Sequence, residues 1–457
     1  MRARCSFVFF VFFVVASLAV KMRKVEPRIL IQSGCYELDN LGDQSMLQAA
    51  IDGIRERLPT ARFSVLSRSD DYLKQLAPDA HRVPVENRRA WKWVRSAYIR
   101  ARTRMPNLDP LIRRRFPSVH AQLLRLKARR LVNHDALRDT QFMVLCGGGY
   151  FTDVFAGQAW SSLERIRAAD AMGIPFAIVG YGFGPLRDAA LLGAARELIP
   201  RARLISIREG LASPRILNDL GVDTAKVLVT GDDAVARAWR AAGDQPRRCI
   251  GVNLRVAAYA GTTDDDVVAV RDALRDAVAS IDCHLIPLAV CLATSVESES
   301  DASVAARIIE GLEHAQVGSS VPTTVGALIS RISECRLVVT GSYHCAVFAL
   351  SQGIPAVCIH HSEYYALKFR GLADRFRIGC AVIDRADTGF HDRLRDAIVE
   401  GWHAADDVRP KLLRAAEQQV ETGRQAYDAL CASIEEHCDP AGSESPDPKA
   451  RRSRLTA

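Results

Sequence analysis

Short apolar segments alternate with amphipathic segments along most of this chain. RILIQSG (28–34) is followed by DQSMLQAAIDGIRERL (43–58), where apolar residues recur at helical spacing, and then by ARFSVLS (61–67). The alternation returns in QFMVLCGGG (141–149) and IPFAIVGYGFG (174–184). Continuous apolar strands separated by amphipathic helices are typical of a parallel sheet that is covered on both faces. The sequence therefore predicts an α/β fold, with ligands bound beyond the carboxyl ends of the strands.

One polar stretch, ARAWRAAGDQPRR (236–248), interrupts this alternation before RCIGVNLRV starts it again. Glycine and proline in such a stretch are typical of a linker. We therefore expect two α/β domains, 22–240 and 241–438, that face each other across a cleft. The tail 439–457 is rich in proline, serine and charged residues, and it is predicted to be disordered.

The first 21 residues form a separate hydrophobic leader. Two arginines precede the uncharged stretch 5–20, which is short for a spanning helix of about 20 apolar residues. We interpret the leader as an upstream extension from a wrongly assigned start codon, with the protein beginning at Met22. A membrane anchor is the alternative.

The twelve cysteines contain no Cys-x-x-Cys pair, so the spacing of zinc and thioredoxin-type sites is missing. Several lie in apolar runs such as LCGGG and AVCIH, where a thiol packs as a small hydrophobe. Reduced thiols are typical of cytosolic proteins. We therefore expect a cytoplasmic protein without a metal site or a redox cofactor.

Positive charge is concentrated in one segment, 82–130, which we call the basic segment. It holds fifteen arginines and lysines against two acids, a net charge of +13, whereas the whole chain carries +8. Four aromatic residues are interleaved with this charge. The pattern suits peripheral contact with an anionic membrane, and a solvated helical hairpin is an equal alternative. No nucleic acid is expected as a partner, because the segment has no recognised nucleic-acid-binding fold around it.

Acidic and glycine-rich loops follow several of the predicted strands. Asp43 in ELDNLGDQSML lies at a helix start, where it either caps the helix or meets a ligand's hydroxyl groups as a contact or a base. Gly148 and Gly149 in LCGGGYFTD precede Asp153, and they lack the Gly-x-Gly-x-x-Gly spacing of a dinucleotide site. Asp232 lies in TGDDA, beside the predicted cleft. A general base is left open among these three acids.

Basic and polar side chains follow other strands. Arg208 in ISIREG can clamp a phosphate or a carboxylate with its forked guanidinium, or it can pair with an acid such as Glu209. Asn253 and Arg255 in GVNLR occupy a similar place. His344 in TGSYHCAVFALSQG lies where a helix starts, and unpaired backbone N–H groups there bind anions. The alternative for His344 is a buried core histidine.

The ordered set of motifs resembles the polysaccharide pyruvyl transferase family over about 29–376. The set consists of NLGDQSML, CGGGYF, GFGP, SIREGLASPRIL, TGDDA, GVNLR and GSYHCAVFALSQGIPAVCI. The resemblance implies a GT-B-like fold, with two Rossmann-like domains and their parallel sheets facing a central cleft. It also implies transfer of a pyruvyl group from phosphoenolpyruvate to a sugar, usually as a ketal across two hydroxyls. The acceptor would be a polysaccharide or a lipid-linked precursor.

Carried over by position, the resemblance implies that His344 and Arg208 hold the donor, and Lys368 matches a lysine that often follows the Gly-Ile-Pro strand. The other site roles are expected from the residue types and the places of the motifs. His344, Arg208 and Asp43 are the expected catalytic residues. Donor-binding is expected of Arg208, His344, Asn253, Arg255, Lys368, Gly341 and Ser342, and the acceptor side of Gly148, Gly149, Asp153 and Asp232. No cofactor is implied beyond phosphoenolpyruvate as donor, and the protein would act in the cytoplasm or on the cytoplasmic face of the membrane.

One position departs from the family. Members often carry arginine two places before the histidine, where this chain has Ser342. A donor-binding cation is then missing, or Arg255 or Lys368 supplies it. Two alternatives remain on the same scaffold: a nucleotide-sugar glycosyltransferase, for which Glu363 would grip the ribose, and a non-catalytic binding protein.

Overall fold

The computed structural model describes residues 26–86, 115, 117–243, 248–293, 299–312 and 321–438. The leader, the tail and most of the basic segment (87–114 and 116) lie outside the described residues.

The first domain is built on seven parallel strands in the order β3-β2-β1-β4-β5-β6-β7. These are β1 (Arg28–Ser33), β2 (Arg62–Leu66), β3 (His81–Val83), β4 (Phe142–Phe151), β5 (Phe176–Phe183), β6 (Ile205–Ile207) and β7 (Val227–Val229). Its helices are α2 (Leu41–Arg57), α3 (Asp70–Leu76), α6 (Pro117–Leu131), α7 (His134–Arg138), α8 (Ala156–Ala171), α9 (Ala189–Leu198), α10 (Ser213–Asp219) and α11 (Val235–Arg240).

Strand β1 shows why its sequence is apolar at successive positions. Leu30 packs on one face of the sheet with Trp160 of α8, whereas Ile29 and Ile31 pack on the other face with Leu47 of α2. Side chains alternate between the two faces of a strand, so a sheet covered on both faces requires apolar residues at consecutive positions.

The second domain has five parallel strands in the order β12-β11-β10-β8-β9. These are β8 (Cys249–Asn253), β9 (His284–Pro287), β10 (Cys335–Thr340), β11 (Ala356–His360) and β12 (Cys380–Asp384). Helices α12 (Asp264–Val278) and α13 (Asp301–Ile309) pack on one face, and α14 (Val325–Ser333), α15 (Tyr343–Ser351) and α16 (Glu363–Phe376) on the other. The predicted α/β fold with parallel sheets is confirmed.

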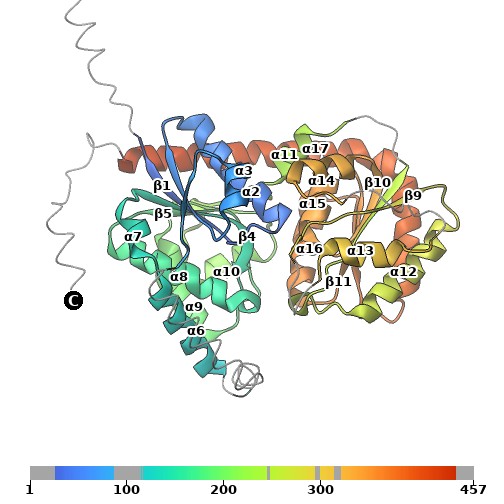
Figure 1. Ribbon diagram of the computed structural model, residues 1–457, viewed down its shortest axis with the longest axis horizontal. Coiled ribbons are helices and arrows are strands. Elements are labelled where there is room, and N and C mark those ends of the chain that lie inside the picture. The colour runs from blue at the N-terminus through green and yellow to red at the C-terminus, as the bar shows by residue number, and fades with distance from the viewer. Residues whose placement is uncertain are drawn as a thin grey trace, which may run out of the picture.

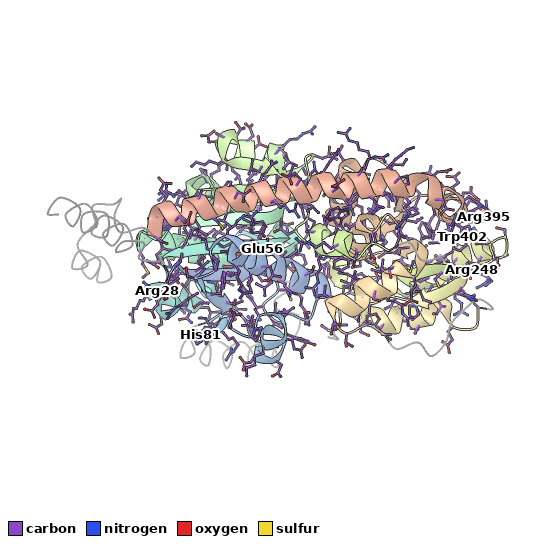
Figure 2. All side chains as sticks on the ribbon, turned by 90° about the horizontal axis from the view of Figure 1, so that it is seen from above. Arg28, Glu56, His81, Arg248, Arg395 and Trp402 are labelled. Atoms are coloured by element: carbon purple, nitrogen blue, oxygen red, sulfur yellow. The ribbon has the colours of Figure 1, made fainter. Side chains whose placement is uncertain are left out.

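One long helix, α17 (Phe390–Cys438), runs over both domains (Figures 1 and 2). Its 49 residues span about 70 Å at a rise of 1.5 Å per residue. Leu394 and Ile398 pack in the core of the second domain, whereas Leu430 and Ile434 pack in the core of the first. The helix therefore joins the two domains a second time, in addition to the linker after α11.

Among the helices of the described residues, none is long and apolar enough to cross a bilayer.

Packing of α17 on the first domain is expected to contribute strongly to stability. Leu430→Ala removes a fully buried side chain and should lower the free energy of unfolding by about 2–5 kcal/mol, measured in urea. Glu436→Ala, at an exposed position of the same helix, is the control and should change it by less than about 0.5 kcal/mol. Equal effects of the two substitutions would show that this end of α17 is not part of the core.

Candidate functional site

Side chains from both domains meet where the strand ends of the two sheets face each other. Asp43, Arg208 and Asp232 come from the first domain, and His344 and Lys368 come from the second. Electrostatic interactions connect all five, since both Arg208 and Lys368 act on the ionisation of Asp43 and of His344. We call this group the charged centre.

Asp232 is the shared partner within the charged centre. Its Oδ2 lies 3.4 Å from Arg208 Nη1 and 3.7 Å from His344 Nε2, and its Oδ1 accepts from the N–H of Ala234 at 2.9 Å. Asp232, Arg208 and His344 are all buried. Arg208 Nη2 and His344 Nε2 have no hydrogen-bond partner among the described residues. A buried donor without a partner is unfavourable, so these two nitrogens are placed to receive the oxygens of a ligand.

The start of α2 packs directly against His344. Asn40 caps this helix by accepting from the N–H groups of Gly42 and Asp43 at 2.9 and 3.2 Å, so Asp43 is not the cap. A Cβ atom on Gly42 would lie 2.0 Å from His344 Nδ1. Only glycine allows this approach between the domains. Gly42 was not predicted from the sequence, although this glycine lies between the capping Asn40 and the candidate residue Asp43 in NLGDQ.

Burial controls the protonation of the two weaker bases. It lowers the pKa of His344 to about 3, Arg208 and Lys368 lower it as well, and Asp232 opposes them. Burial and the charge of Arg208 hold the pKa of Lys368 well below its usual range. His344 is therefore neutral at neutral pH, and an anion placed beside both bases would raise both pKa values.

Two tyrosines and a glycine line the cationic side of the centre. The Arg208 guanidinium lies 4.3 Å from the ring centroid of Tyr343, and Lys368 Nζ lies 4.1 Å from that of Tyr364. A Cβ on Gly149 would lie 2.8 Å from Arg208 Nη2 and 3.0 Å from Lys368 Cε. The space between these groups is about 20 Å³, enough for one water. A larger anion therefore requires these walls to move apart.

Asp43 lies between the cationic groups and a larger cavity. Tyr150 donates to its Oδ2 at 3.0 Å. Burial raises the pKa of Asp43 to about 6, against the lowering effects of the Tyr150 hydrogen bond, Lys368 and Arg208. The cavity measures about 520 Å³ and is also lined by Phe155 of the first domain and Tyr259 of the second. Gly148 and Gly149, expected in a loop after the strand, lie within β4, where Gly148 at φ +96° marks an irregularity in the pairing with β5 just before Tyr150.

Asn253 and Arg255 are held by partners outside the charged centre. Arg255 Nη1 donates to Asp301 Oδ1 at 3.1 Å and to the carbonyl of Glu299 at 2.8 Å, and its Nε donates to Tyr259 at 3.0 Å. Asn253 donates to Asp301 Oδ2 at 3.0 Å. Arg255 lines the 520 Å³ cavity. Both side chains therefore stabilise the end of β8. Of the two cations expected to replace the family arginine, Lys368 is the one that lies beside Arg208.

Gly341 and Ser342 shape the start of α15. A Cβ on Gly341 would lie 2.8 Å from Leu254 Cδ1, so the glycine permits close packing. Ser342 is buried, its N–H donates to Thr340 Oγ1 at 2.9 Å, and its side chain makes no capping hydrogen bond. The first N–H groups of α15 are therefore not capped by Ser342.

Three acids that the sequence singled out have other roles in the structure. Asp153 accepts from the backbone N–H groups of Arg187 and Asp188 at 2.6 and 3.1 Å. Glu363 accepts from Arg187 at 2.6 Å in an exposed ion pair between the domains. Glu209 accepts from three N–H groups at the start of α10, so it is not the partner of Arg208. Asp43 and Asp232 are the acids that remain in the charged centre.

Tyr150, Tyr343 and Tyr364 were missed at the level of sequence. Each is next to a residue or motif that was singled out, but a tyrosine carries no charge that would mark it. Within the described ranges, no group of histidine, cysteine and acidic side chains could hold a metal ion.

Comparison with solved structures identifies the fold. The glycotransferase of kitacinnamycin shares 15% identity with a TM-score of 0.54, covering 91% of this chain and 100% of its own. S. aureus MnaA, solved with UDP, shares 11% with a TM-score of 0.54 and coverages of 92% and 99%. The UDP-GlcNAc 2-epimerase from Neisseria meningitidis, solved with UDP-GlcNAc, shares 10% with a TM-score of 0.51 and coverages of 90% and 100%. The predicted GT-B-like fold is thus confirmed.

Comparison with sequences identifies the family. No curated protein matches the chain. The family model described as polysaccharide pyruvyl transferase matches residues 40–363, which include every member of the charged centre except Lys368. Because this match covers most of the chain, the protein is a transferase that belongs to the polysaccharide pyruvyl transferase family.

Proposed function

We propose that this enzyme transfers a pyruvyl group from phosphoenolpyruvate to hydroxyls of a sugar, in a polysaccharide or its lipid-linked precursor, and releases phosphate. The observation that carries the proposal is the charged centre, where three basic side chains lie together and two buried nitrogens have no hydrogen-bond partner among the described residues. Phosphoenolpyruvate carries a carboxylate and a phosphate, so its site needs two or three cations.

The two unpaired nitrogens define the donor contacts. Arg208 Nη2 and His344 Nε2 would receive oxygens of the phosphate or the carboxylate, and Lys368 would supply the third positive charge. Ionic contacts are stronger in a buried site than in water. The N–H groups at the start of α15 add favourable dipoles. The proposal needs no cofactor besides the donor.

The reaction can be balanced with two acceptor hydroxyls. The methylene carbon of phosphoenolpyruvate takes up a proton, which leaves an oxocarbenium-like centre at the neighbouring carbon. One sugar oxygen bonds to that centre, the bond to the phosphate oxygen breaks, and a second sugar oxygen closes the ketal. The two sugar hydroxyls release two protons. One balances the proton taken up by the methylene carbon, which becomes a methyl group, and the other leaves on the phosphate. Arg208 and His344 would stabilise the departing phosphate.

Asp43 is the base that the structure favours for the acceptor. Its pKa of about 6 lies near the operating pH, as an efficient general base requires. It faces the 520 Å³ cavity, which is within the usual size range of small-molecule sites. Asp232 is engaged by Arg208, and Asp153 by backbone N–H groups. We therefore place the sugar in this cavity.

A lipid-linked acceptor would bring the enzyme to a membrane surface, and α6 offers a contact. Val119, Leu123 and Leu126 recur at helical spacing on this helix and are 46%, 50% and 51% exposed. The same stretch of the chain also carries five basic residues, Arg115, Arg125, Lys127, Arg129 and Arg130. Exposed apolar residues beside positive charge fit an anionic lipid surface, so we place α6 and the basic segment against the cytoplasmic face.

Loss of the donor contacts should abolish the proposed reaction. Arg208→Gln and His344→Gln are each expected to reduce phosphate release from radiolabelled phosphoenolpyruvate by about 10²-fold or more. Both should also lose thermal stabilisation by phosphoenolpyruvate. Arg187→Gln, which alters only an exposed ion pair, should retain both properties. If the protein instead turns over nucleotide sugars, and neither it nor any variant releases phosphate from phosphoenolpyruvate, it is a glycosyltransferase.

The pH profile should report Asp43. A base acts when deprotonated, so kcat/KM should fall as the pH decreases through about 6. The Tyr150 hydrogen bond lowers the pKa of Asp43, so Tyr150→Phe should move this acidic limb to higher pH. Asp43→Asn should reduce kcat by about 10²–10⁴-fold while phosphoenolpyruvate still binds. An unchanged limb in Tyr150→Phe would exclude Asp43 as the titrating base.

Membrane contact should require both charge and the apolar face of α6. The protein is expected to co-sediment with anionic vesicles and to dissociate as salt increases. Leu123→Ser combined with Leu126→Ser should weaken this binding, whereas Val268→Ser, at a 56% exposed position on α12, should not. Equal binding to neutral vesicles would contradict the electrostatic contribution.

A further inference from the structure

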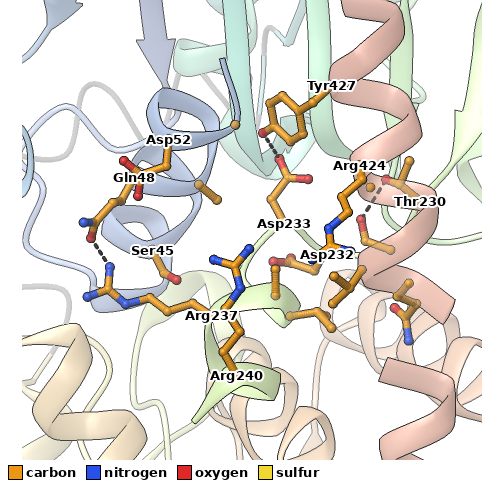
Figure 3. Close-up of a pocket in the computed structure, with 18 of the residues that line it drawn as sticks. Ser45, Gln48, Asp52, Thr230, Asp232, Asp233, Arg237, Arg240, Arg424 and Tyr427 are labelled. Carbon is orange, nitrogen blue, oxygen red and sulfur yellow. Dashed lines mark hydrogen bonds between the residues drawn. The ribbon is translucent and has the colours of Figure 1, made fainter. Parts of the chain in front are cut away.

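A second cavity adjoins the charged centre through the loop 230–233. It measures about 360 Å³, and its walls come from α2, α11 and α17 (Figure 3). Helix α11 is the last helix before β8, and α17 runs over both domains. The cavity therefore lies at the two places where the chain connects the domains. Asp232 lines it and also contacts Arg208 and His344.

Guanidinium groups extend into this cavity. Figure 3 shows Arg240 of α11 pointing into it and Arg424 extending toward it from α17. Among the described residues, no hydrogen bond or ion pair engages Arg240. The guanidinium of Arg424 has a 3.8 Å contact with Glu421 on its own helix. Arg237 also lines the cavity and donates to Gln48. The guanidinium groups of Arg240 and Arg424 thus have few partners among the described residues around this cavity.

A buried hydroxyl in the same wall also lacks a partner. Ser45 of α2 is 1% exposed and lines the cavity, and its Oγ makes no hydrogen bond with the described residues. A buried polar atom without a partner destabilises the protein by about 1–3 kcal/mol. Its position therefore independently indicates a polar ligand in the cavity.

The acids around the cavity have local partners. Asp52 lies 3.5 Å from Arg55, and Glu56 lies 3.8 Å from Arg57. Both acids are exposed, so they stand at the mouth and are well solvated. Arg240 and Arg424 are exposed as well. Burial raises the pKa of Asp52 and Arg240 lowers it from a distance, but no ion pair between described residues joins either arginine to these two acids.

Asp233 is the one acid on the inner wall without an arginine partner. Its Oδ2 accepts from Tyr427 at 2.9 Å. Burial and the neighbouring Asp232 raise its pKa to about 7, while the Tyr427 hydrogen bond lowers it. A fraction of Asp233 is therefore protonated at neutral pH and can donate to an anion.

We propose that this cavity is a second ligand site, which binds a small phosphate-bearing molecule of the size of a sugar phosphate. Arg240 and Arg424 contact the phosphate, and Ser45 donates its hydroxyl. Guanidinium groups match phosphate oxygens in geometry and charge. A cavity of about 360 Å³ lies at the lower end of the range for small-molecule sites, which favours one sugar unit over a longer chain.

The location gives such a ligand an effect on the reaction. It would contact α11, which precedes the linker, α17, which runs over both domains, and the loop 230–233 that carries Asp232. Any ligand that binds two arrangements of these elements unequally must shift the equilibrium between them. Occupancy of the cavity is therefore expected to change the affinity of the charged centre for its donor.

Calorimetric titration with glucose 1-phosphate tests the site. The Arg208→Gln protein serves as background, so that binding at the charged centre does not contribute. Arg240→Gln or Arg424→Gln in this background should weaken binding roughly tenfold or more, as expected for one charged hydrogen bond. Arg414→Gln, at an exposed position of α17 outside the cavity, should leave it unchanged. Ser45→Ala should also weaken binding.

Matched ligands decide what is recognised. Glucose should not bind, because it lacks the phosphate. Inorganic phosphate with the affinity of glucose 1-phosphate would support the site and narrow its ligand to phosphate itself. The proposal is overturned if glucose binds equally well, if the Arg208→Gln background shows no binding at millimolar concentration, or if both arginine variants bind like Arg414→Gln.

Discussion

One buried carboxylate, that of Asp232, is the interaction on which the candidate site depends. It faces Arg208 of its own domain and His344 of the other through the same oxygen. Burial of a charge is tolerated only where an opposite charge or a hydrogen bond compensates. Here the two acids of the charged centre, Asp232 and Asp43, face three bases, so the compensation is incomplete. The result is visible in His344 and Lys368, whose pKa values are both lowered. A dianionic substrate would supply the missing charge, and its binding would be accompanied by proton uptake.

The same interaction links chemistry to the arrangement of the domains. Gly42 touches the imidazole of His344 from the first domain, and Asp232 faces it from the other side. The space beside Arg208 and Lys368 is about 20 Å³, too small for phosphoenolpyruvate. Entry of the proposed donor would thus require some separation of groups that belong to different domains. The connections that would accommodate this movement are the linker after α11 and the helix α17.

The sequence predicted the helices and strands better than it predicted which side chains contact one another. Alternating apolar segments were sufficient for both parallel sheets, because a doubly covered sheet requires that pattern. Arg208 and Arg255 looked alike, since each follows a strand. Arg255 is held by Asp301, 46 positions away in the chain, and by Glu299 and Tyr259. Arg208 pairs with Asp232, but its Nη2 keeps no hydrogen-bond partner among the described residues. Spacing does not reveal such a long-range pair. For the same reason the sequence did not indicate that the last turns of α17, which was assigned to the second domain, pack on the first domain.

If Ser342 stands where relatives carry arginine, as the sequence resemblance implies, the change has a physical consequence. Lys368, from the neighbouring helix α16, occupies the space beside Arg208 and Gly149. An arginine stays charged in every protein environment, whereas a lysine changes its pKa readily when buried. A centre with one arginine and one lysine therefore carries less fixed charge than a centre with two arginines. It is less strained by repulsion before the donor binds, and it gains its second full cation when the donor's negative charge arrives. Donor affinity should consequently be more sensitive to pH here than in a relative that retains both arginines.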